Sequence, residues 1–486
     1  MKRIYSCLLV LVCIPLFLLT GCKEEILSSD PSLTLRFSCD SLCFDTVFTE
    51  AGSSTLAMMV YNPNRNAVKI SRVTLQTSYF QVNLDGENDL NRLTNITVNG
   101  KDSLYLFVRV FIPELSDNNP VLITDTLRFY VNSNEQSIPL QAYGQNVHLW
   151  RTKERHRIID GSFTFLNDKP YLIFDTLIIT GKAILPEGTT LYLHSATNLL
   201  FYGGIAARGT ADKPVRIAGD RLDKLFEHVP YRVASGQWGG VYLIQPQNTS
   251  QHDDTLNYID ILSGNVGLFC RSEQTDPMPH LTMSNARIHN HALYGLVLQN
   301  VNADVWNTEI SNCASYCVYL DGGKHVLTHN TIASFFGWPY TNLNIHNTTR
   351  ADVAAVYINN LSKPTPTEVH MRNCIITGAR QNNLVLATPL PEYYTGEFYG
   401  NYLKADTIRT PNCHDNVYAA DNDTVFKNTY YRYKEYVYYD FRLDSISPAR
   451  SIGDSLIAEQ SPFRQDRLGI NRNGKKPDAG CYEWQP

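Results

Sequence analysis

A short motif ending in isoleucine recurs along this chain at a fixed spacing. Its isoleucines, Ile288, Ile310, Ile332 and Ile376, lie 22, 22 and 44 residues apart, so one step of the rhythm is missing. Self-similarity at this period is typical of a solenoid, in which a single repeat cannot bury its apolar face alone. We therefore predict stacked coils with a dry ladder of isoleucines. The motif copies are Asn285-Ala286-Arg287-Ile288, Asn307-Thr308-Glu309-Ile310, His329-Asn330-Thr331-Ile332 and Asn373-Cys374-Ile375-Ile376.

The asparagines that open the motif form a second predicted ladder. Asn285, Asn307 and Asn373 share one position of the repeat, and His329 occupies it in the third copy. We expect these side chains to hydrogen-bond from coil to coil along a turn. Upstream, residues 171–217 consist of short apolar runs separated by Gly, Pro and Asn, which is typical of parallel strands buried inside a coil.

Several motifs resemble those of a known solenoid family. The turn at Pro186-Glu187-Gly188-Thr189 and the run Gln237-Trp238-Gly239-Gly240 resemble the opening coils of right-handed parallel β-helices, the pectate-lyase-like solenoids. Near the other end, Asp466-Arg467-Leu468-Gly469 and Pro477-Asp478-Ala479-Gly480 resemble the closing signature of bacterial secreted β-helices, although Cys481 departs from its pattern. The resemblance implies a right-handed parallel β-helix over residues 158–486, closed by a C-terminal cap.

Residues 33–146 follow a different pattern. Short alternating segments separated by Asn-Pro, Asp-Gly and Asn-Gly turns favour a β-sandwich, and they resemble immunoglobulin-like spacer domains found ahead of surface β-helices. The basic residues clustered within 147–157 are expected to form a solvated linker or strand edge. The predicted fold class is therefore all-β, an N-terminal β-sandwich followed by a right-handed parallel β-helix.

The N-terminal segment has the features of an export signal. Lys2 and Arg3 precede an apolar stretch at 4–19, and Leu19-Thr20-Gly21-Cys22 resembles a lipobox. We expect residues 1–21 to be a lipoprotein signal peptide, Cys22 to be lipidated and 22–32 to tether the protein to a membrane. Lys23-Glu24-Glu25 resembles a surface-export signal, so the expected location is the outer membrane, facing the cell surface, with a periplasm-facing lipoprotein as the alternative.

Charge and cysteine spacing limit the expected partners. The net charge is −5 and no basic stripe is present, so we expect no nucleic-acid partner. The cysteines show no zinc-finger spacing, and we predict no metal site. Cys270, Cys374 and Cys413 are expected to be small inward-facing hydrophobes. No cofactor is evident, and calcium, which some lyases of the resembled fold require, is unsupported by any cluster of acids.

The catalytic candidates are Arg287, His289 and His291. Arg287-Ile288-His289 is the nearest match to a hydrolase-type basic triplet, but the sequence shows no paired aspartates one coil away. The repeat places His289 beside Ser311 and His291 beside Cys313, with no carboxylate expected beside His289.

Aromatic side chains provide a competing set of ligand-binding candidates, since their apolar faces stack on sugar rings. The later tyrosines, at 430–439, are expected instead to pack the last coils or cover the open end. We expect a surface protein that binds a glycan or a surface protein without catalysis; the alternative is a polysaccharide lyase or glycoside hydrolase. The ligand-binding candidates are Trp306, Trp338, Tyr340, Tyr393 and Tyr394.

Overall fold

The computed structural model describes residues 26–226, 229–274, 276–336, 353–361, 365–408, 412–430, 438–472 and 476–486. The chain divides into two compact units, one formed by residues up to 115 with 120–145 and the other by 116–119 with 146–486. Cys22, Trp338 and Tyr340 lie outside the described residues. Within the described residues, no helix has both the length and the apolar character needed to span a membrane.

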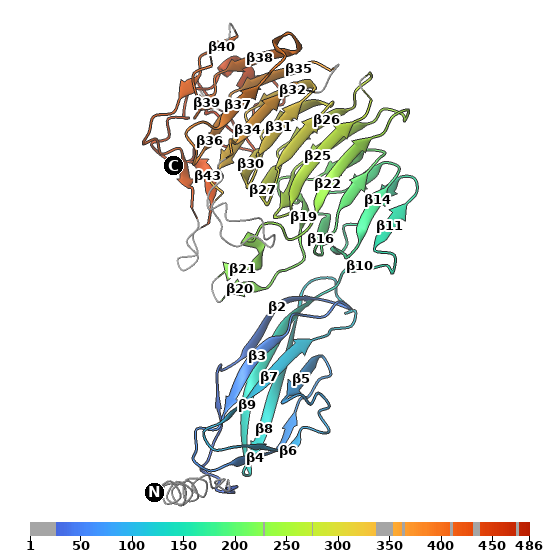
Figure 1. Ribbon diagram of the computed structural model, residues 1–486, viewed down its shortest axis with the longest axis vertical. Coiled ribbons are helices and arrows are strands. Elements are labelled where there is room, and N and C mark those ends of the chain that lie inside the picture. Colours follow the sequence, from blue (N-terminus) through green and yellow to red (C-terminus); the bar gives the residue numbers. More distant parts are fainter. Residues whose placement is uncertain are drawn as a thin grey trace, which may run out of the picture. The chain divides into compact units, whose positions relative to one another are not determined.

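The first unit is a β-sandwich (Figure 1). Side chains that alternate between the two faces of each strand build its core. The strand at 103–110 buries Leu106, Val108 and Val110 and turns Tyr105 and Phe107 outward. One sheet has the order β1 (Arg36–Phe37), β3 (Leu56–Tyr61), β7 (Ser103–Val110), β5 (Phe80–Leu84). The other has the order β2 (Leu42–Phe48), β9 (Asn134–Gln145), β8 (Val121–Val131), β4 (Val68–Thr74), β6 (Thr94–Val98).

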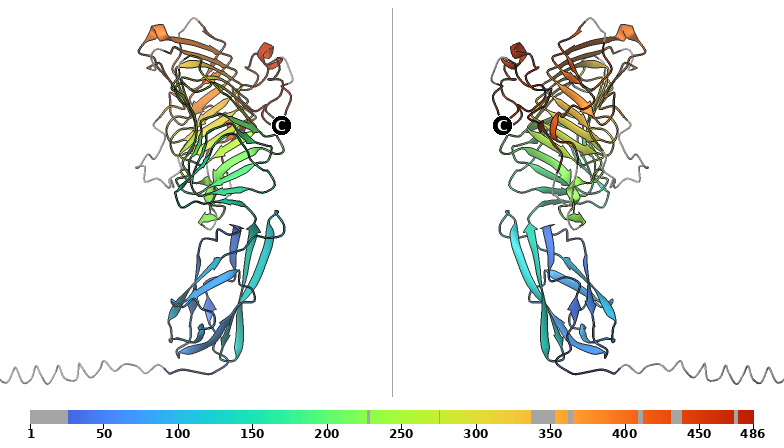
Figure 2. Two further views of the ribbon diagram at one scale, coloured as in Figure 1. Left: turned by 90° about the vertical axis from the view of Figure 1, so that its right-hand side faces the viewer. Right: turned by 90° about the vertical axis from the view of Figure 1, so that its left-hand side faces the viewer.

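The second unit is a parallel β-helix whose coils stack their strands into three long parallel sheets (Figure 1, Figure 2). Sheet 1 contains β10 (His148–Trp150), β13 (Tyr171–Ile173), β16 (Thr190–Leu193), β19 (Val215–Gly219), β24 (Ile259–Leu262), β27 (Arg287–His291), β30 (Glu309–Cys313), β33 (Thr331–Ser334), β36 (Ile375–Gly378), β39 (Tyr402–Leu403) and β41 (Val417–Tyr418). Sheet 2 contains β11 (His156–Ile159), β14 (Thr176–Ile179), β17 (Leu199–Phe201), β22 (Gly240–Gln245), β25 (Val266–Ser272), β28 (Leu296–Gln299), β31 (Val318–Asp321), β34 (Val356–Asn359) and β37 (Leu384–Ala387). Sheet 3 contains β12 (Phe163–Thr164), β15 (Ala183–Leu185), β18 (Ile205–Arg208), β23 (Asp253–Asn257), β26 (His280–Ser284), β29 (Asn302–Trp306), β32 (Gly323–Thr328), β35 (Thr367–Arg372), β38 (Tyr394–Tyr399) and β40 (Cys413–His414).

These two units confirm the predicted fold class, a β-sandwich followed by a parallel β-helix solenoid. The stretch 147–157, expected to be a linker or strand edge, contains β10 and the start of β11, so the parallel sheets begin at His148. Shorter elements lie outside the three sheets. They are β20 (Lys224–Phe226), β21 (Val229–Pro230), η1 (Tyr231–Val233), η2 (Pro391–Tyr393), β42 (Phe426–Asn428), β43 (Asp440–Leu443) and α2 (Ser455–Ala458).

The isoleucine ladder forms as predicted, in sheet 1. Ile288 pairs with Ile310, and Ile310 pairs with Ile332, all fully buried. Ile332 then pairs directly with Ile376. No coil is therefore missing in the 44-residue step. The step is a single coil in which the connection between neighbouring strands is longer.

The backbone conformation of the turn before each ladder isoleucine explains why asparagine recurs at that position. Asn285, Asn307 and Asn373 have φ of 53°, 49° and 53°, and His329 has 52°. Asparagine tolerates this left-handed backbone better than most residues. Its amide also links coils as expected, since Nδ2 of Asn307 donates to Oδ1 of Asn285 at 3.3 Å and Nδ2 of Asn373 lies 3.0 Å from Nε2 of His329.

The closing signature packs against the side of the solenoid, whereas we expected it to cap the end. We call residues 447–472 and 476–483 the strap. Nη2 of Arg467 contacts Asp260 at 2.8 Å, and the hydroxyl of Tyr482 contacts Glu309 at 2.6 Å. The backbone N–H of Gly480 reaches the carbonyl of Asn373 at 2.8 Å. The strap therefore crosses the strands from β24 to β36, and its buried Ala479 and Cys481 pack on the outside of sheet 1.

The cysteines expected to face inward do so to different degrees. Cys270 and Cys374 are 2% and 0% exposed, whereas Cys413 is partly buried against the core. Among the described residues, no cysteine forms a disulfide.

Candidate functional site

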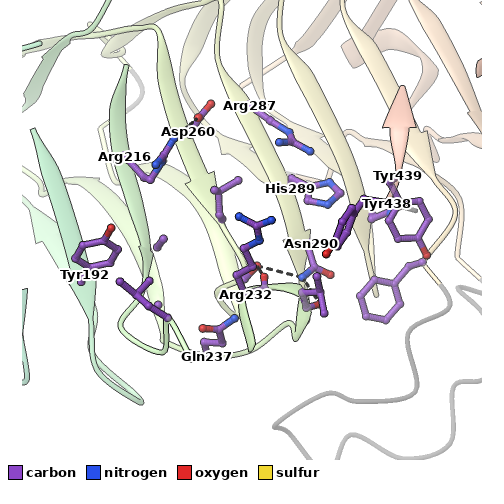
Figure 3. A pocket seen from close by; sticks show the side chains of 18 residues that line it. Tyr192, Arg216, Arg232, Gln237, Asp260, Arg287, His289, Asn290, Tyr438 and Tyr439 are labelled. Carbon is purple, nitrogen blue, oxygen red and sulfur yellow. Dashed lines mark hydrogen bonds and ion pairs between the residues drawn. The ribbon is translucent and has the colours of Figure 1, made fainter. Parts of the chain in front are cut away.

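The outer face of sheet 1 carries a cleft of about 540 Å³ (Figure 3). Its floor consists of the outward side chains of β16, β19, β24 and β27, and loop residues from 222–237 and 438–439 form its sides. The lining residues are Tyr192, Arg216, Ala218, Gly219, Leu222, Arg232, Val233, Gln237, Asp260, Leu262, Ser263, Arg287, His289, Asn290, Asn312, Phe336, Tyr438 and Tyr439.

Strand β27 places two of the three predicted catalytic residues in this cleft. Ile288 points into the core, so Arg287 and His289 point outward. Asn290 then adopts a left-handed backbone with φ of 66°, and His291 turns inward. His291 is fully buried, its Nε2 lies 3.1 Å from the carbonyl of Ile261, and burial lowers its pKa to about 4. His291 therefore has a structural role and is absent from the cleft.

Charged side chains of alternating sign cross sheet 1 in register. Arg216 pairs with Asp260, Asp260 with Arg287, and Arg287 with Glu309. The nearest atoms of Arg216 and Asp260 are 3.9 Å apart, and Nε of Arg287 is 3.1 Å from Oε1 of Glu309. Cross-strand neighbours of opposite charge stabilise such a face. Arg467 of the strap adds a second cation to Asp260.

Glu309 is a buried carboxylate held by several donors. Nε of Arg287, the hydroxyl of Ser311 at 2.7 Å and the hydroxyl of Tyr482 at 2.6 Å all contact it. Burial alone would raise the pKa of Glu309, but the charge of Arg287, the neighbouring His289 and the Tyr482 hydroxyl outweigh burial and lower it to about 2. Glu309 is therefore ionised in the folded protein near neutral pH.

His289 is linked to that carboxylate through Ser311. Its Nδ1 lies 2.8 Å from Oγ of Ser311, and its ring packs edge-on to Tyr439 and Phe441. The side chain keeps 16% of its surface exposed. Burial, with the positive charge of Arg287 second, lowers the pKa of His289 to about 3. The imidazole is therefore neutral near pH 7.

A third arginine reaches the cleft from η1. Figure 3 shows Arg232 extending over the sheet from the loop, with His289 lying between Arg287 and Tyr438. The Arg232 guanidinium is 5.8 Å from the Tyr438 ring. Nδ2 of Asn290 donates to the carbonyl of Val233 at 2.8 Å, which fixes this loop against β27.

The predicted ligand-binding aromatics lie elsewhere. Trp306 is on sheet 3, edge-on to Phe463 of the strap. Tyr393 ends η2, and Tyr394 begins β38, packs against the core and has its pKa raised by burial. None of these three residues lines the cleft, whose aromatic side chains are those of Tyr192, Phe336, Tyr438 and Tyr439.

Sequence reasoning missed the residues that complete the site. We expected no carboxylate beside His289, yet Oε1 of Glu309 lies 3.9 Å from its Nδ1. A signal was available, because Glu309 occupies the same motif position as Arg287 one coil earlier. Arg232 and Tyr438 carried no such signal, since they reach the cleft from irregular connections. Within the described part of the chain, no three His, Cys, Asp or Glu side chains gather as a metal site.

Comparisons with known proteins identify no relative. No family model matches this chain, and no curated protein matches it. The E. coli chaperone DraB aligns at 11% identity and a TM-score of 0.17, covering 24% of this chain and 55% of its own. A family 123 glycoside hydrolase from Clostridium perfringens aligns at 7% identity and a TM-score of 0.18, covering 24% and 30%. A PapD-like domain of human CEP192 aligns at 11% and 0.17, covering 26% and 94%. Likenesses this weak carry no argument about fold or function.

Proposed function

We propose that this protein binds an acidic polysaccharide in the cleft on sheet 1. The observation that carries the proposal is the charge of the lining. The charged side chains there, apart from the neutral His289, are three arginines, Arg216, Arg232 and Arg287, and one carboxylate, Asp260. Asp260 is already matched by Arg467 of the strap at 2.8 Å. When Glu309, which pairs with Arg287, is also counted, four arginines face two carboxylates, and the cleft therefore offers unbalanced positive charge to a ligand.

Arginine suits a carboxylate ligand. Its planar guanidinium donates two parallel hydrogen bonds to a carboxylate, which a lysine cannot match. Arg287 contacts Glu309 through Nε, and its two terminal nitrogens make no hydrogen bond to another described residue. Tyr192 and Tyr438 lie at the same cleft, and their apolar faces suit a pyranose ring.

The setting of the cleft supports a surface-binding role. The sequence resembles pectate-lyase-like β-helices, and the lipobox-like segment that ends at Cys22 predicts a lipid anchor there. We propose an outer-membrane lipoprotein whose cleft faces the cell exterior, with a periplasm-facing lipoprotein as the alternative location. An acidic segment of another surface protein is the second candidate ligand, because it would offer the same carboxylates without sugar rings.

Binding to a uronate polymer and to its neutral ester tests the proposal. Polygalacturonate and fully methyl-esterified polygalacturonate share a backbone and differ in charge, and alginate and hyaluronan extend the comparison. We expect calorimetry on the purified chain to detect binding to at least one acidic polymer and none to the ester. Equal affinity for the ester would contradict the proposal.

Paired substitutions locate the binding. Arg216→Gln with Arg232→Gln should weaken affinity at least tenfold, because charge-assisted hydrogen bonds contribute about 1.5–3 kcal/mol each. Arg464→Gln, on an exposed part of the strap, is the matched control. Unchanged affinity in the double variant would place the ligand elsewhere.

The anchor has its own test. Cys22→Ala should move the protein from the membrane fraction to the soluble fraction. Retention of this variant on membranes would overturn the lipoprotein assignment and leave the cleft untouched.

A further inference from the structure

The first described residues are fixed to one end of the sandwich. Leu27 forms an isolated parallel bridge with Ala67. The N–H of Ser28 donates to the carbonyl of Ala67 at 2.9 Å, and the N–H of Ala67 donates to the carbonyl of Ile26 at 3.1 Å. Ala67 directly precedes β4, so the bridge lies at the end of the sandwich where β4 begins and β6 ends (Figure 1). The chain is therefore bound to the sandwich from Ile26 onward.

This segment exposes two large aliphatic side chains next to each other. Ile26 is 69% exposed and Leu27 is 51% exposed, whereas Ala67 beside them is buried. The backbone hydrogen bonds of the bridge keep both side chains on the surface, where water solvates them poorly. Exposed aliphatic residues are common on protein surfaces, so the position of this pair in the chain decides its meaning.

The pair lies very close to the proposed lipid anchor. Three residues separate Cys22 from Ile26 in the sequence. An extended chain rises at most about 3.6 Å per residue, so the Cα atom of Ile26 can lie no more than about 14 Å from that of Cys22. With lipid on Cys22, that residue lies at the surface of the bilayer. The end of the sandwich that carries Ile26 is then the part of this unit held next to the membrane.

We propose that this end of the sandwich docks on the bilayer that holds the anchor, with Ile26 and Leu27 inserted among the lipid headgroups. The inference rests on the proposed lipid anchor at Cys22. So short a connection keeps both side chains at a high effective concentration beside the lipid, and a contact too weak to form in free solution forms once the anchor is in place. The two side chains leave water as they enter the bilayer.

The charges at this end of the sandwich balance, so the contact is apolar. The end consists of segment 26–34 and of the loops 62–67, 99–102 and 132–133. The N–H of Lys101 donates to the carbonyl of Asn64 at 3.0 Å, which packs two of the loops together. The charged residues of these four stretches are all exposed, and they are Arg65, Lys101, Asp30 and Asp102. Two cations next to two carboxylates give anionic lipid no advantage over zwitterionic lipid.

Fluorescence quenching by brominated lipid tests the contact on the full lipidated chain in phosphatidylcholine vesicles. Leu27→Trp places an indole in the proposed contact. Leu122→Trp is the matched control, because Leu122 is 50% exposed and lies in β8, nine residues and roughly 30 Å before Val131 at the docking end. With bromine near the headgroup end of the acyl chains, and the wild-type signal subtracted, the fluorescence added by Leu27→Trp should fall about twofold or more, since inserted side chains reach about 5–10 Å into this region. The fluorescence added by Leu122→Trp should not change.

Photolabelling repeats the test without an added tryptophan. Wild-type chain is placed in phosphatidylcholine vesicles that carry a diazirine on one acyl chain. A protease that cuts after glutamate releases residues 26–50 from the lipidated terminus, because Glu25 and Glu50 are consecutive glutamates. These residues should carry the label. The double variant Ile26→Ser with Leu27→Ser should carry no more label there than the Cys22→Ala chain, with the thermal midpoint of the wild-type protein.

Mass spectrometry of the terminus separates two kinds of failure. If Cys22 carries lipid but Leu27→Trp is not quenched, or residues 26–50 of the wild-type chain take no label, the inference is wrong and the anchor stands. Equal quenching of Leu27→Trp and Leu122→Trp, or quenching that requires added phosphatidylglycerol, also contradicts the inference. If Cys22 carries no lipid, the proposed anchor and this inference fail together, and the proposed binding in the cleft is unaffected.

Discussion

Tyr482 donates its hydroxyl hydrogen to Oε2 of Glu309 at 2.6 Å, although 173 residues separate them in the chain. The other oxygen of the same carboxylate accepts from Arg287 and Ser311. One buried carboxylate therefore joins the strap to the floor of the cleft. The C-terminal signature, which the sequence suggested is a cap, also helps to organise the candidate site.

Removing this hydroxyl should destabilise the β-helix. Tyr482→Phe leaves a buried, ionised carboxylate with one donor fewer, and hydrogen bonds to charged groups contribute about 1.5–3 kcal/mol. We expect a loss of that size in the free energy of unfolding, measured by urea denaturation. Tyr202→Phe is the matched control, because the Tyr202 hydroxyl makes no hydrogen bond to another described residue. Equal stability of the two variants would show that the contact contributes nothing.

The sequence predicted the coils well because their chemistry is periodic. Ile288 and Ile310 must face inward in every coil, so the repeat reports their register directly. Asn307 likewise indicates a turn, because the same left-handed backbone recurs at the matching positions Asn285, His329 and Asn373. The longer connection before Ile376 doubled the spacing between the isoleucines but left Ile376 paired with Ile332.

The sequence predicted only those residues of the site that belong to the periodic repeat. Arg287 and His289 belong to the repeat, so the outward face of β27 could be inferred. Their neighbours Arg232 and Tyr438 come from irregular segments, whose path depends on tertiary contacts such as the one between Asn290 and Val233. His291 was misassigned to the same face because nothing in the periodicity shows that Asn290 breaks the alternation.

Asn307 offers a test of the turn ladder. Its Nδ2 donates to the carbonyl of Gln465 at 2.7 Å, and its Oδ1 accepts from Arg472 at 2.8 Å. Asn307→Gly loses these two bonds and the bond to Asn285 but tolerates φ of 49°, whereas Asn307→Ala loses the same three bonds and is strained there. We expect both to unfold at lower urea concentration and Ala to cost roughly 1 kcal/mol more than Gly. The opposite order would contradict the role assigned to the backbone conformation.

Arg467 should anchor the strap to the solenoid. Its guanidinium contacts Asp260 at 2.8 Å and the carbonyl of Ala286 at 3.2 Å, and both charged side chains are largely buried, at 14% and 13% exposure. Arg467→Met leaves Asp260 with only the more distant Arg216, so we expect a loss of about 3 kcal/mol. Arg464→Met, at an exposed site, should change the unfolding free energy by less than about 0.5 kcal/mol. Limited proteolysis that cuts the strap equally slowly in both variants would argue against the anchor.

The buried histidines predict how stability changes with pH. Burial lowers the pKa of His291 to about 4 and that of His325 to about 3, against an ordinary value near 6.5. Between these values the unfolded chain binds protons that the folded protein refuses, so the free energy of unfolding decreases as pH falls from about 6.5 towards 4. Glu309, whose pKa is also lowered, adds to this loss only below its ordinary pKa of 4.5. Glu483 acts in the opposite sense, because burial raises its pKa to about 7 and the folded protein binds its proton between about pH 7 and 4.5. The wild-type slope in this window is therefore the difference between the two effects, and a histidine variant is needed to separate them.

A single substitution isolates one of these histidines. His325 points into the core between Ala303 and Val369 in register, so His325→Leu replaces the ring with an apolar side chain. Each buried histidine contributes a slope of up to ~1.4 kcal/mol per pH unit, and the variant should lose one such contribution between pH 6 and 5. Urea denaturation at the two pH values measures it, with the exposed His414→Gln expected to keep the wild-type slope. A slope that is the same in His325→Leu and wild type would mean that His325 protonates in the folded protein as readily as in the unfolded chain.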